Sequence, residues 1–168
     1  MERYVVAVLV KNQFGVLNRV TSMFRRRQFN ISSLTVSETE SNEYSRITVT
    51  FDGDEVKEQQ LINQLYKLPD VVSIRELNAA NTVSAELLLI KMENDANTRA
   101  DIISAVDAFD AKTVDYSRES MVFQLTAESR RIDEFINIMR DYTILEICRT
   151  GIVSLEKGAE TIRKVTNL

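Results

Sequence analysis

The chain has 168 residues, a hydrophobic fraction of 44% and a formal net charge of −4. Its length suits one domain or two small ones, and its apolar content is enough for a buried core. It has no histidine and a single cysteine, Cys148, which excludes histidine-based nucleophile systems, internal disulfides and zinc cages. The acidic balance argues against nucleic-acid binding, and the longest apolar run, residues 5–10, is too short for a membrane span or a signal peptide. We therefore expect a cytoplasmic binding module without metal or catalytic residues of its own.

The first half of the chain predicts the element order βαββαβ. Residues 4–10 are apolar and β-branched, which is typical of a buried strand, and residues 16–27 follow helical spacing. Residues 31–36 and 47–51 predict two further strands, the second with one face exposed to water. Asp52-Gly53-Asp54 can turn the chain and cap a helix that carries leucines at helical spacing, and residues 71–77 predict the last strand.

The second half repeats this order. Residues 85–92 predict a strand, Asn97 or Thr98 starts a helix, and residues 114–116 and 121–125 predict short strands. Ser129 can cap the next helix, residues 144–150 form the last strand, and the tail from Ser154 has mixed helical character. The repeat predicts an α+β fold of two ferredoxin-like βαββαβ units in tandem, with residues 1–78 and 79–168 as the two domains.

Units this small leave one sheet face and two sheet edges open. Exposed strand edges favour pairing with another chain. We therefore expect at least a homodimer, formed by side-by-side pairing of sheets through apolar edges such as residues 5–10.

The segment Asn12-Gln-Phe-Gly-Val-Leu17 joins the first strand to the first helix. The free N–H groups and the positive dipole end of a helix N-terminus bind carboxylates, so the N–H groups of Val16 and Leu17 are candidates for this role. Gly15 lets a ligand approach the main chain closely. The amides of Asn12 and Asn30 can satisfy the ammonium and carboxylate of a free amino acid. The alternative interpretation is that both asparagines only cap or turn the chain.

Motifs spread over nearly the whole chain resemble the small regulatory subunit of acetolactate synthase, also called acetohydroxyacid synthase. The resemblance rests on Asn12-x-x-Gly-Val-Leu-x-Arg-Val20, Phe24-x-Arg-Arg-x-Phe-Asn-Ile-x-Ser-Leu-Thr-Val36 and Ser45-Arg-Ile-Thr48. It continues through Gln64-Leu-x-Lys-Leu-x-Asp-Val-Val72, Glu86-Leu-x-Leu-Ile-Lys91, Val114-Asp115 and Arg149-Thr-Gly151. The first half is similar to an ACT domain, the amino-acid-sensing form of the ferredoxin-like fold.

This resemblance implies a non-catalytic subunit in branched-chain amino-acid biosynthesis. The family partner is a separate catalytic chain that binds thiamine diphosphate, Mg and FAD, whereas this chain is expected to hold no cofactor. The small subunit activates that chain and makes it sensitive to feedback by a branched-chain amino acid, usually valine. The resemblance places the effector between two ACT domains. One chain would contribute Asn12, Gly15, Val16 and Leu17, and its partner would contribute Asn30, Ile31 and Thr35.

Two positions depart from the family pattern: Gln28 stands where glycine is common, and Ala85 replaces a frequent arginine. If Gln28 ends the first helix in the left-handed region, it costs about 1 kcal/mol relative to glycine. Arg25-Arg-Arg27 is best explained by the negative dipole end of that helix. A free-standing amino-acid sensor that acts on another enzyme or a transcription factor is the alternative function.

Overall fold

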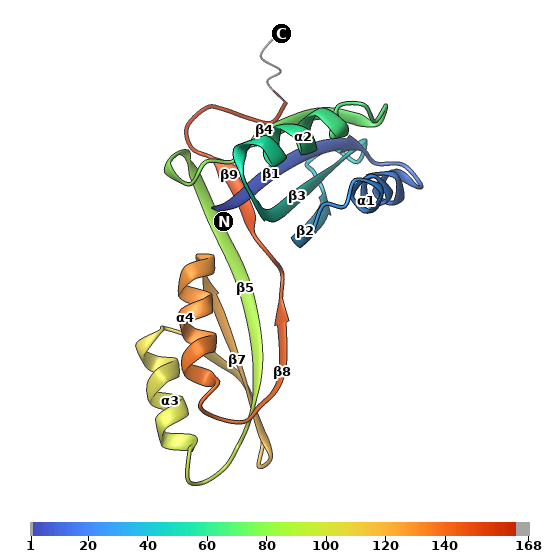
Figure 1. Ribbon diagram of the computed structural model, residues 1–168. Coiled ribbons are helices and arrows are strands. Elements are labelled where there is room, and N and C mark those ends of the chain that lie inside the picture. The colour runs from blue at the N-terminus through green and yellow to red at the C-terminus, as the bar shows by residue number, and fades with distance from the viewer. Residues whose placement is uncertain (1, 164–168) are drawn as a thin grey trace. The chain divides into compact units, whose positions relative to one another are not determined.

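The computed structural model describes residues 2–163, which form two compact units (Figure 1). The first unit comprises residues 2–84 and 152–163, and the second comprises residues 85–151. Each unit contains the expected βαββαβ order. The predicted tandem ferredoxin-like fold is therefore confirmed.

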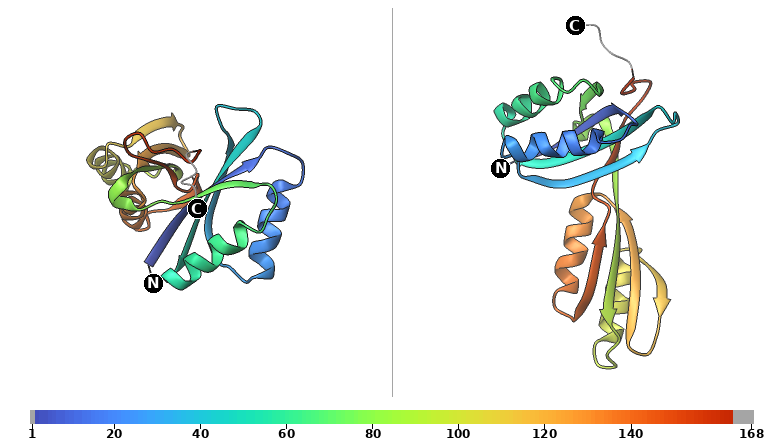
Figure 2. Two further views of the ribbon diagram at one scale, coloured as in Figure 1. Left: turned by 90° about the horizontal axis from the view of Figure 1, so that it is seen from above. Right: turned by 90° about the vertical axis from the view of Figure 1, so that its right-hand side faces the viewer.

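The first unit is a four-stranded antiparallel sheet with the strand order β2-β3-β1-β4. Both helices lie on the same side of this sheet (Figure 2). Its elements in chain order are β1 (Glu2–Lys11), α1 (Val16–Arg26), β2 (Ile31–Glu38), β3 (Tyr44–Gly53), α2 (Glu55–Leu65) and β4 (Val71–Glu76). Strand β1, which contains the apolar run of residues 5–10, lies between β3 and β4. The expectation that this run forms a pairing edge is therefore wrong, because both of its sides are occupied within the chain. The edges of this sheet are β2 and β4.

The helix-facing side of this sheet forms the core of the first unit. Val6 and Val8 of β1 lie opposite Val49 and Ile47 of β3, so all four side chains share one face. The residues that α1 and α2 pack against this core recur at helical spacing: Val16, Val20, Met23, Phe24, Leu61, Ile62 and Leu65. Asp54 caps α2 as expected, because its carboxylate accepts a 2.8 Å hydrogen bond from the Lys57 N–H.

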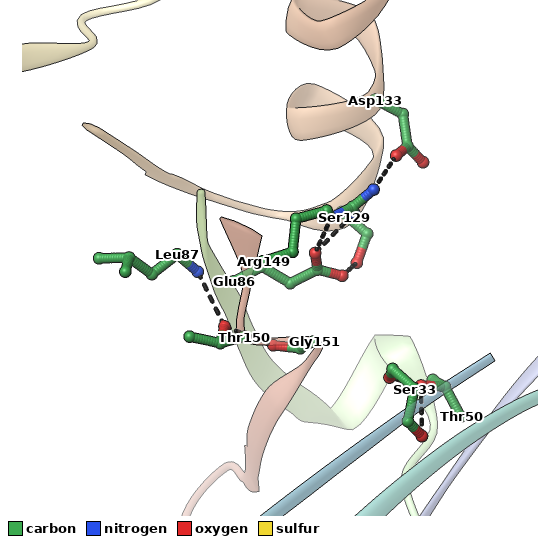
Figure 3. A network of polar contacts seen from close by, with 9 residues as sticks. All are labelled: Ser33, Thr50, Glu86, Leu87, Ser129, Asp133, Arg149, Thr150 and Gly151. Atoms are coloured by element: carbon green, nitrogen blue, oxygen red, sulfur yellow. Dashed lines mark hydrogen bonds and ion pairs between the residues drawn. The ribbon is translucent and has the colours of Figure 1, made fainter. Parts of the chain in front are cut away.

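The far face of this sheet differs from the sequence prediction. Thr48 and Thr50, which were expected to face water, are 5% and 2% exposed. The Thr50 hydroxyl forms a hydrogen bond with that of Ser33 on the neighbouring strand, so its polar atom is satisfied in the interior (Figure 3). Part of this face is also contacted by the C-terminal segment, since the Arg46 guanidinium on β3 donates to the Ser154 carbonyl at 2.8 Å.

The predicted helical tail from Ser154 begins as a strand, and its residues beyond 163 lie outside the described part of the chain. Ser154 lies in β9 (Val153–Glu156), which pairs with β5 (Thr82–Glu93). The Lys157 N–H donates at 2.8 Å to the carbonyl of Asn81, in a short 3-10 turn, η1 (Ala79–Asn81), that lies between β4 and β5. Residues 152–163 therefore belong to the first compact unit, whereas the expected domains, 1–78 and 79–168, assign them to the second half.

The second unit has the strand order β6-β7-β5-β8. Helices α3 and α4 lie next to each other on one side of its sheet (Figure 1). Its elements after β5 are α3 (Arg99–Ala108), β6 (Lys112–Tyr116), β7 (Ser120–Ala127), α4 (Ser129–Met139) and β8 (Ile144–Arg149). Ser129 does not cap α4 as expected, because its hydroxyl donates to the Glu86 carboxylate instead. No helix among residues 2–163 is long and apolar enough to cross a membrane.

Candidate functional site

The turn between β1 and α1 leaves part of a helix N-terminus open. Gly15 precedes the helix with φ of 80°, a left-handed conformation that glycine adopts without a Cβ penalty. The Val16 N–H donates to the Gln13 carbonyl at 3.3 Å, so its expected role as a free donor is wrong. Within residues 2–163, the N–H groups of Leu17 and Asn18 meet no acceptor. These two donors, at the positive dipole end of α1, can bind a carboxylate.

The side chain of Asn12 is held beside this turn. Its Nδ2 donates to Glu38 Oε1 at 3.1 Å and to the Asn42 carbonyl at 3.0 Å, and its backbone N–H donates to Glu43 at 2.8 Å. The Asn12 side chain therefore holds the turn against the β2–β3 connection. This is a structural role of the kind that the alternative interpretation gives to this asparagine. Both amide hydrogens are used, whereas among the described residues nothing donates to its Oδ1. This oxygen is able to accept a hydrogen bond from an ammonium group.

Sequence reasoning missed an ion pair near the turn between the half-exposed Arg19 and a buried carboxylate. Arg19 Nε lies 2.7 Å from Asp70 Oδ2, and Asp70 is only 8% exposed. A Cβ added to Gly15 would lie 3.4 Å from Arg19 Nη1, so this guanidinium sits close to the open helix end. Arg19 lies one helical turn after Gly15, so the local spacing could have predicted that its side chain lies near the helix N-terminus. Asp70 lies 51 residues further along the chain, and no local pattern links the two.

Phe14 is a second missed feature of the turn. Its side chain is fully exposed, and the neighbouring Leu17 is 43% exposed. A large apolar side chain at the tip of a loop carries an unfavourable hydration cost in an isolated chain. The turn therefore has polar groups that can bind the carboxylate and the ammonium of an amino acid, and exposed apolar side chains lie beside these groups.

The second group of predicted residues begins at the other end of α1 and continues along β2. Gln28 has φ of 57°, and the Phe29 N–H donates to the Phe24 carbonyl at 3.0 Å, which completes a Schellman-type helix end. Asn30 follows as an exposed residue, and β2 then begins at Ile31 and includes Thr35. The condition stated for Gln28, a left-handed conformation at the end of the first helix, is therefore met.

One chain does not bring the two groups together. Helix α1 has 11 residues, which corresponds to about 16 Å at 1.5 Å per residue, and it separates the Asn12 turn from Asn30. Ile31 and Thr35 lie on β2, an edge strand of the sheet. An edge strand can pair with a second chain. The geometry is therefore compatible with a site completed by two copies, and it excludes one assembled from all seven residues of a single copy.

A separate polar network in the second unit explains two of the sequence motifs. Glu86 is 4% exposed, and its Oε2 accepts from Arg149 Nε at 2.9 Å and from Nη2 at 2.6 Å (Figure 3). The Ser129 hydroxyl donates to the other Glu86 oxygen, and Arg149 Nη1 donates to Asp133 at 2.7 Å. The neighbouring Thr150 hydroxyl accepts from the Leu87 N–H at 3.1 Å. This network joins β5, α4 and β8, so its role is to hold the second unit together.

Comparisons with known proteins agree with this architecture. Residues 6–73 match the family described as "AHAS small subunit-like ACT domain", and residues 85–158 match "Small subunit of acetolactate synthase". A relative from Archaeoglobus fulgidus, described as a probable acetolactate synthase small subunit, is 40% identical over 93% of this chain and 98% of its own length. The acetolactate synthase small subunit of Bacillus subtilis is 39% identical over 93% of this chain and 91% of its own.

A solved structure shows the same fold over the full length. The crystal structure of the acetolactate synthase small subunit from Thermotoga maritima has a TM-score of 0.86 and 35% sequence identity. The match covers 94% of this chain and 99% of that one. The two βαββαβ units, the family matches in both halves and these full-length relatives together show that the chain belongs to the family of acetolactate synthase small subunits.

Proposed function

We propose that this chain is a regulatory subunit that binds and activates the separate catalytic chain of acetolactate synthase and makes it sensitive to a branched-chain amino acid, with valine as the first candidate. The catalytic chain would hold thiamine diphosphate, Mg and FAD and would carry out the condensation of 2-oxoacids. This chain would contribute binding surfaces and an effector site in place of reacting groups.

The open N-terminus of α1 carries the effector part of the proposal. The free N–H groups of Leu17 and Asn18 suit the carboxylate of an amino acid, and the Asn12 Oδ1 suits its ammonium. No acidic residue lies in the first turn of α1 to compete for its positive end. The half-exposed Leu17 offers apolar contact for a branched side chain. A free amino acid carries a binding partner for each of these groups.

A homodimer would complete this site. The exposed edge of β2 would pair with that of a second copy, which would bring Asn30 and Ile31 of the partner toward the Asn12 turn. An amino acid bound across the two copies would then favour one arrangement of the dimer. Because coupling between two binding events is reciprocal, that arrangement must also differ in its affinity for the catalytic chain or in its ability to activate it.

The decisive experiment reconstitutes activity with the catalytic chain and measures activation and valine inhibition separately. Asn12→Ala and Asn30→Ala should each weaken valine inhibition at least tenfold and leave activation within about twofold of wild type, since about 1.4 kcal/mol of lost binding corresponds to tenfold. Asn63→Ala, which changes an exposed asparagine on α2, is the matched control and should alter neither quantity. Loss of activation together with inhibition would show that the asparagines are structural.

A binding measurement on the chain alone separates this function from a free-standing sensor. An amino acid present at 100 times its dissociation constant stabilises the folded state by about 2.7 kcal/mol, a shift of several degrees for a chain of this size. A midpoint raised by valine, without any effect of this chain on the catalytic subunit, would favour the sensor. Activation of the catalytic subunit by this chain would favour the regulatory subunit.

A further inference from the structure

The far face of the first sheet contains a cavity that the proposed effector site does not use. It has a volume of about 440 Å³, within the range of small-molecule sites, and it lies between this sheet face and the C-terminal segment. Leu9, Arg46 and Ser37 come from three adjacent strands and lie opposite one another in register, so their side chains form one continuous floor. The opposite wall comes from residues 155–163. All of these residues belong to the first compact unit.

Arg46 supplies hydrogen-bond donors to this cavity. Its Nη2 donates to the Ser154 carbonyl at 2.8 Å, and no carboxylate of residues 2–163 forms an ion pair with it. Burial lowers the pKa of the Arg46 guanidinium, and the negative charge of Glu156 opposes this change. A half-buried guanidinium normally binds a carboxylate or a phosphate through two of its N–H groups. The remaining N–H groups of Arg46 are suited to such an acceptor.

The other walls of the cavity narrow the choice of ligand. The second arginine of the lining, Arg163, is paired with Glu40 at 3.0 Å. The lining contains more carboxylates than guanidiniums, which disfavours a polyanion such as a nucleotide. It also contains three large apolar residues. The acidic and apolar members of the lining are Glu38, Glu40, Glu156, Glu160, Leu9, Leu155 and Ile162.

Glu156 Oε2 lies 3.9 Å from Arg75 Nε, which leaves Oε1 of this carboxylate as the acceptor that faces a ligand. We propose that this cavity binds a small apolar α-amino acid, with its carboxylate on the free N–H groups of Arg46, its ammonium toward Glu156 Oε1 and its side chain against Leu9, Leu155 and Ile162. This site is distinct from the α1 turn and does not depend on the effector function proposed above. It lies wholly within one copy of the chain, so its occupancy requires no dimer.

Methyl-labelled NMR of the full chain tests the proposal with L-leucine as the probe. Binding in the cavity should shift the methyl signals of Leu155 and Ile162, whereas binding at the α1 turn should shift those of Val16, Leu17 and Ile31. 4-Methyl-2-oxopentanoate lacks the ammonium and 3-methylbutylamine lacks the carboxylate. Both should bind at least tenfold more weakly in the cavity than leucine. Shifts confined to the α1 turn, no shifts at all, or equal binding of the amine would each overturn the proposal.

Two variants confirm which groups are responsible. Arg46→Gln should weaken the cavity shifts at least tenfold, whereas Arg3→Gln, which changes an exposed arginine of the same sheet, should change them less than twofold. Leu155→Ala removes part of the apolar wall at a side chain that is already 61% exposed, so this variant should fold even if Arg46→Gln does not. It should also weaken leucine binding several-fold. Unchanged binding to Leu155→Ala would overturn the assignment.

Discussion

Glu58 carries a pH-dependent cost to the stability of the first unit. Its side chain lies on α2 and the residue is 9% exposed. Burial is the largest cause that raises its pKa to about 7 from the ordinary 4.5, and the negative charges of Glu76, Glu55 and Glu2 add to it. These neighbours come from β4, α2 and β1, so carboxylates surround Glu58 from three elements.

The direction of the pH effect follows from proton linkage. Between pH 4.5 and pH 7 the folded state holds a proton on Glu58 that the unfolded state has released, so the free energy of unfolding falls as the pH rises through this range. Each pKa unit corresponds to about 1.4 kcal/mol, which gives an upper value of about 3 kcal/mol above pH 7. Contact with solvent reduces this, and we expect about 1–3 kcal/mol.

Glu58→Gln should therefore leave the free energy of unfolding nearly unchanged at pH 4.5 and raise it by about 1–3 kcal/mol at pH 8. Urea unfolding at a series of pH values measures both quantities, with a fluorescent or NMR probe placed in the first unit. Glu43→Gln, which changes an exposed carboxylate in the β2–β3 connection of the same unit, is the control and should show no such increase. A gain that is equal at both pH values would refute the reasoning, because it would arise from packing instead of ionisation.

Four further substitutions test the local geometry. Gln28→Gly should stabilise the chain by about 1 kcal/mol, because glycine adopts the observed left-handed φ of 57° more easily; a lower thermal midpoint would contradict this. Asp54→Ala removes the cap of α2 and should lower the free energy of unfolding, measured with urea, by about 1 kcal/mol. An unchanged free energy of unfolding would show that the hydrogen bond to the Lys57 N–H does not stabilise the helix. Glu86→Ala leaves Arg149 without its buried partner and should cost about 3 kcal/mol. Asp133→Asn, at the exposed end of the same network, should cost less than about 1 kcal/mol, and equal losses would show that burial of Glu86 is unimportant.

The placement of the proposed effector groups refines their roles. Asn12 was expected to offer both a donor and an acceptor, but its two amide hydrogens bind Glu38 and the Asn42 carbonyl. Its oxygen is the atom left for a ligand. Val16 is similarly replaced by Asn18 as the second free backbone donor, because the Val16 N–H closes onto Gln13. These changes alter which atoms of the proposed site are available to an amino acid.

Local patterns in the sequence determine the elements and their order. The strand and helix periods of both halves predict all twelve elements of the two βαββαβ repeats, because side chains two or about 3.6 residues apart face the same side. The helix-end conformation of Gln28 and the cap at Asp54 are also local, since each depends on bonds between residues three to five positions apart. The turn at Gly15 belongs to the same class. Such features can be read before any long-range contact is known.

Only the tertiary structure decides which strand becomes an edge, which face of a sheet is covered and which charges meet. The apolar run of β1 is compatible with an edge or a centre, and pairing with both β3 and β4 places it at the centre. The ion pairs Arg19–Asp70 and Arg149–Glu86, each with a buried carboxylate, join residues 51 and 63 positions apart. Residues 152–163 return to the first unit, where they contact Arg46 and Asn81 and contribute one wall of a cavity. Each of these outcomes depends on the free energy of contacts between distant segments, which neither segment's own periodicity encodes.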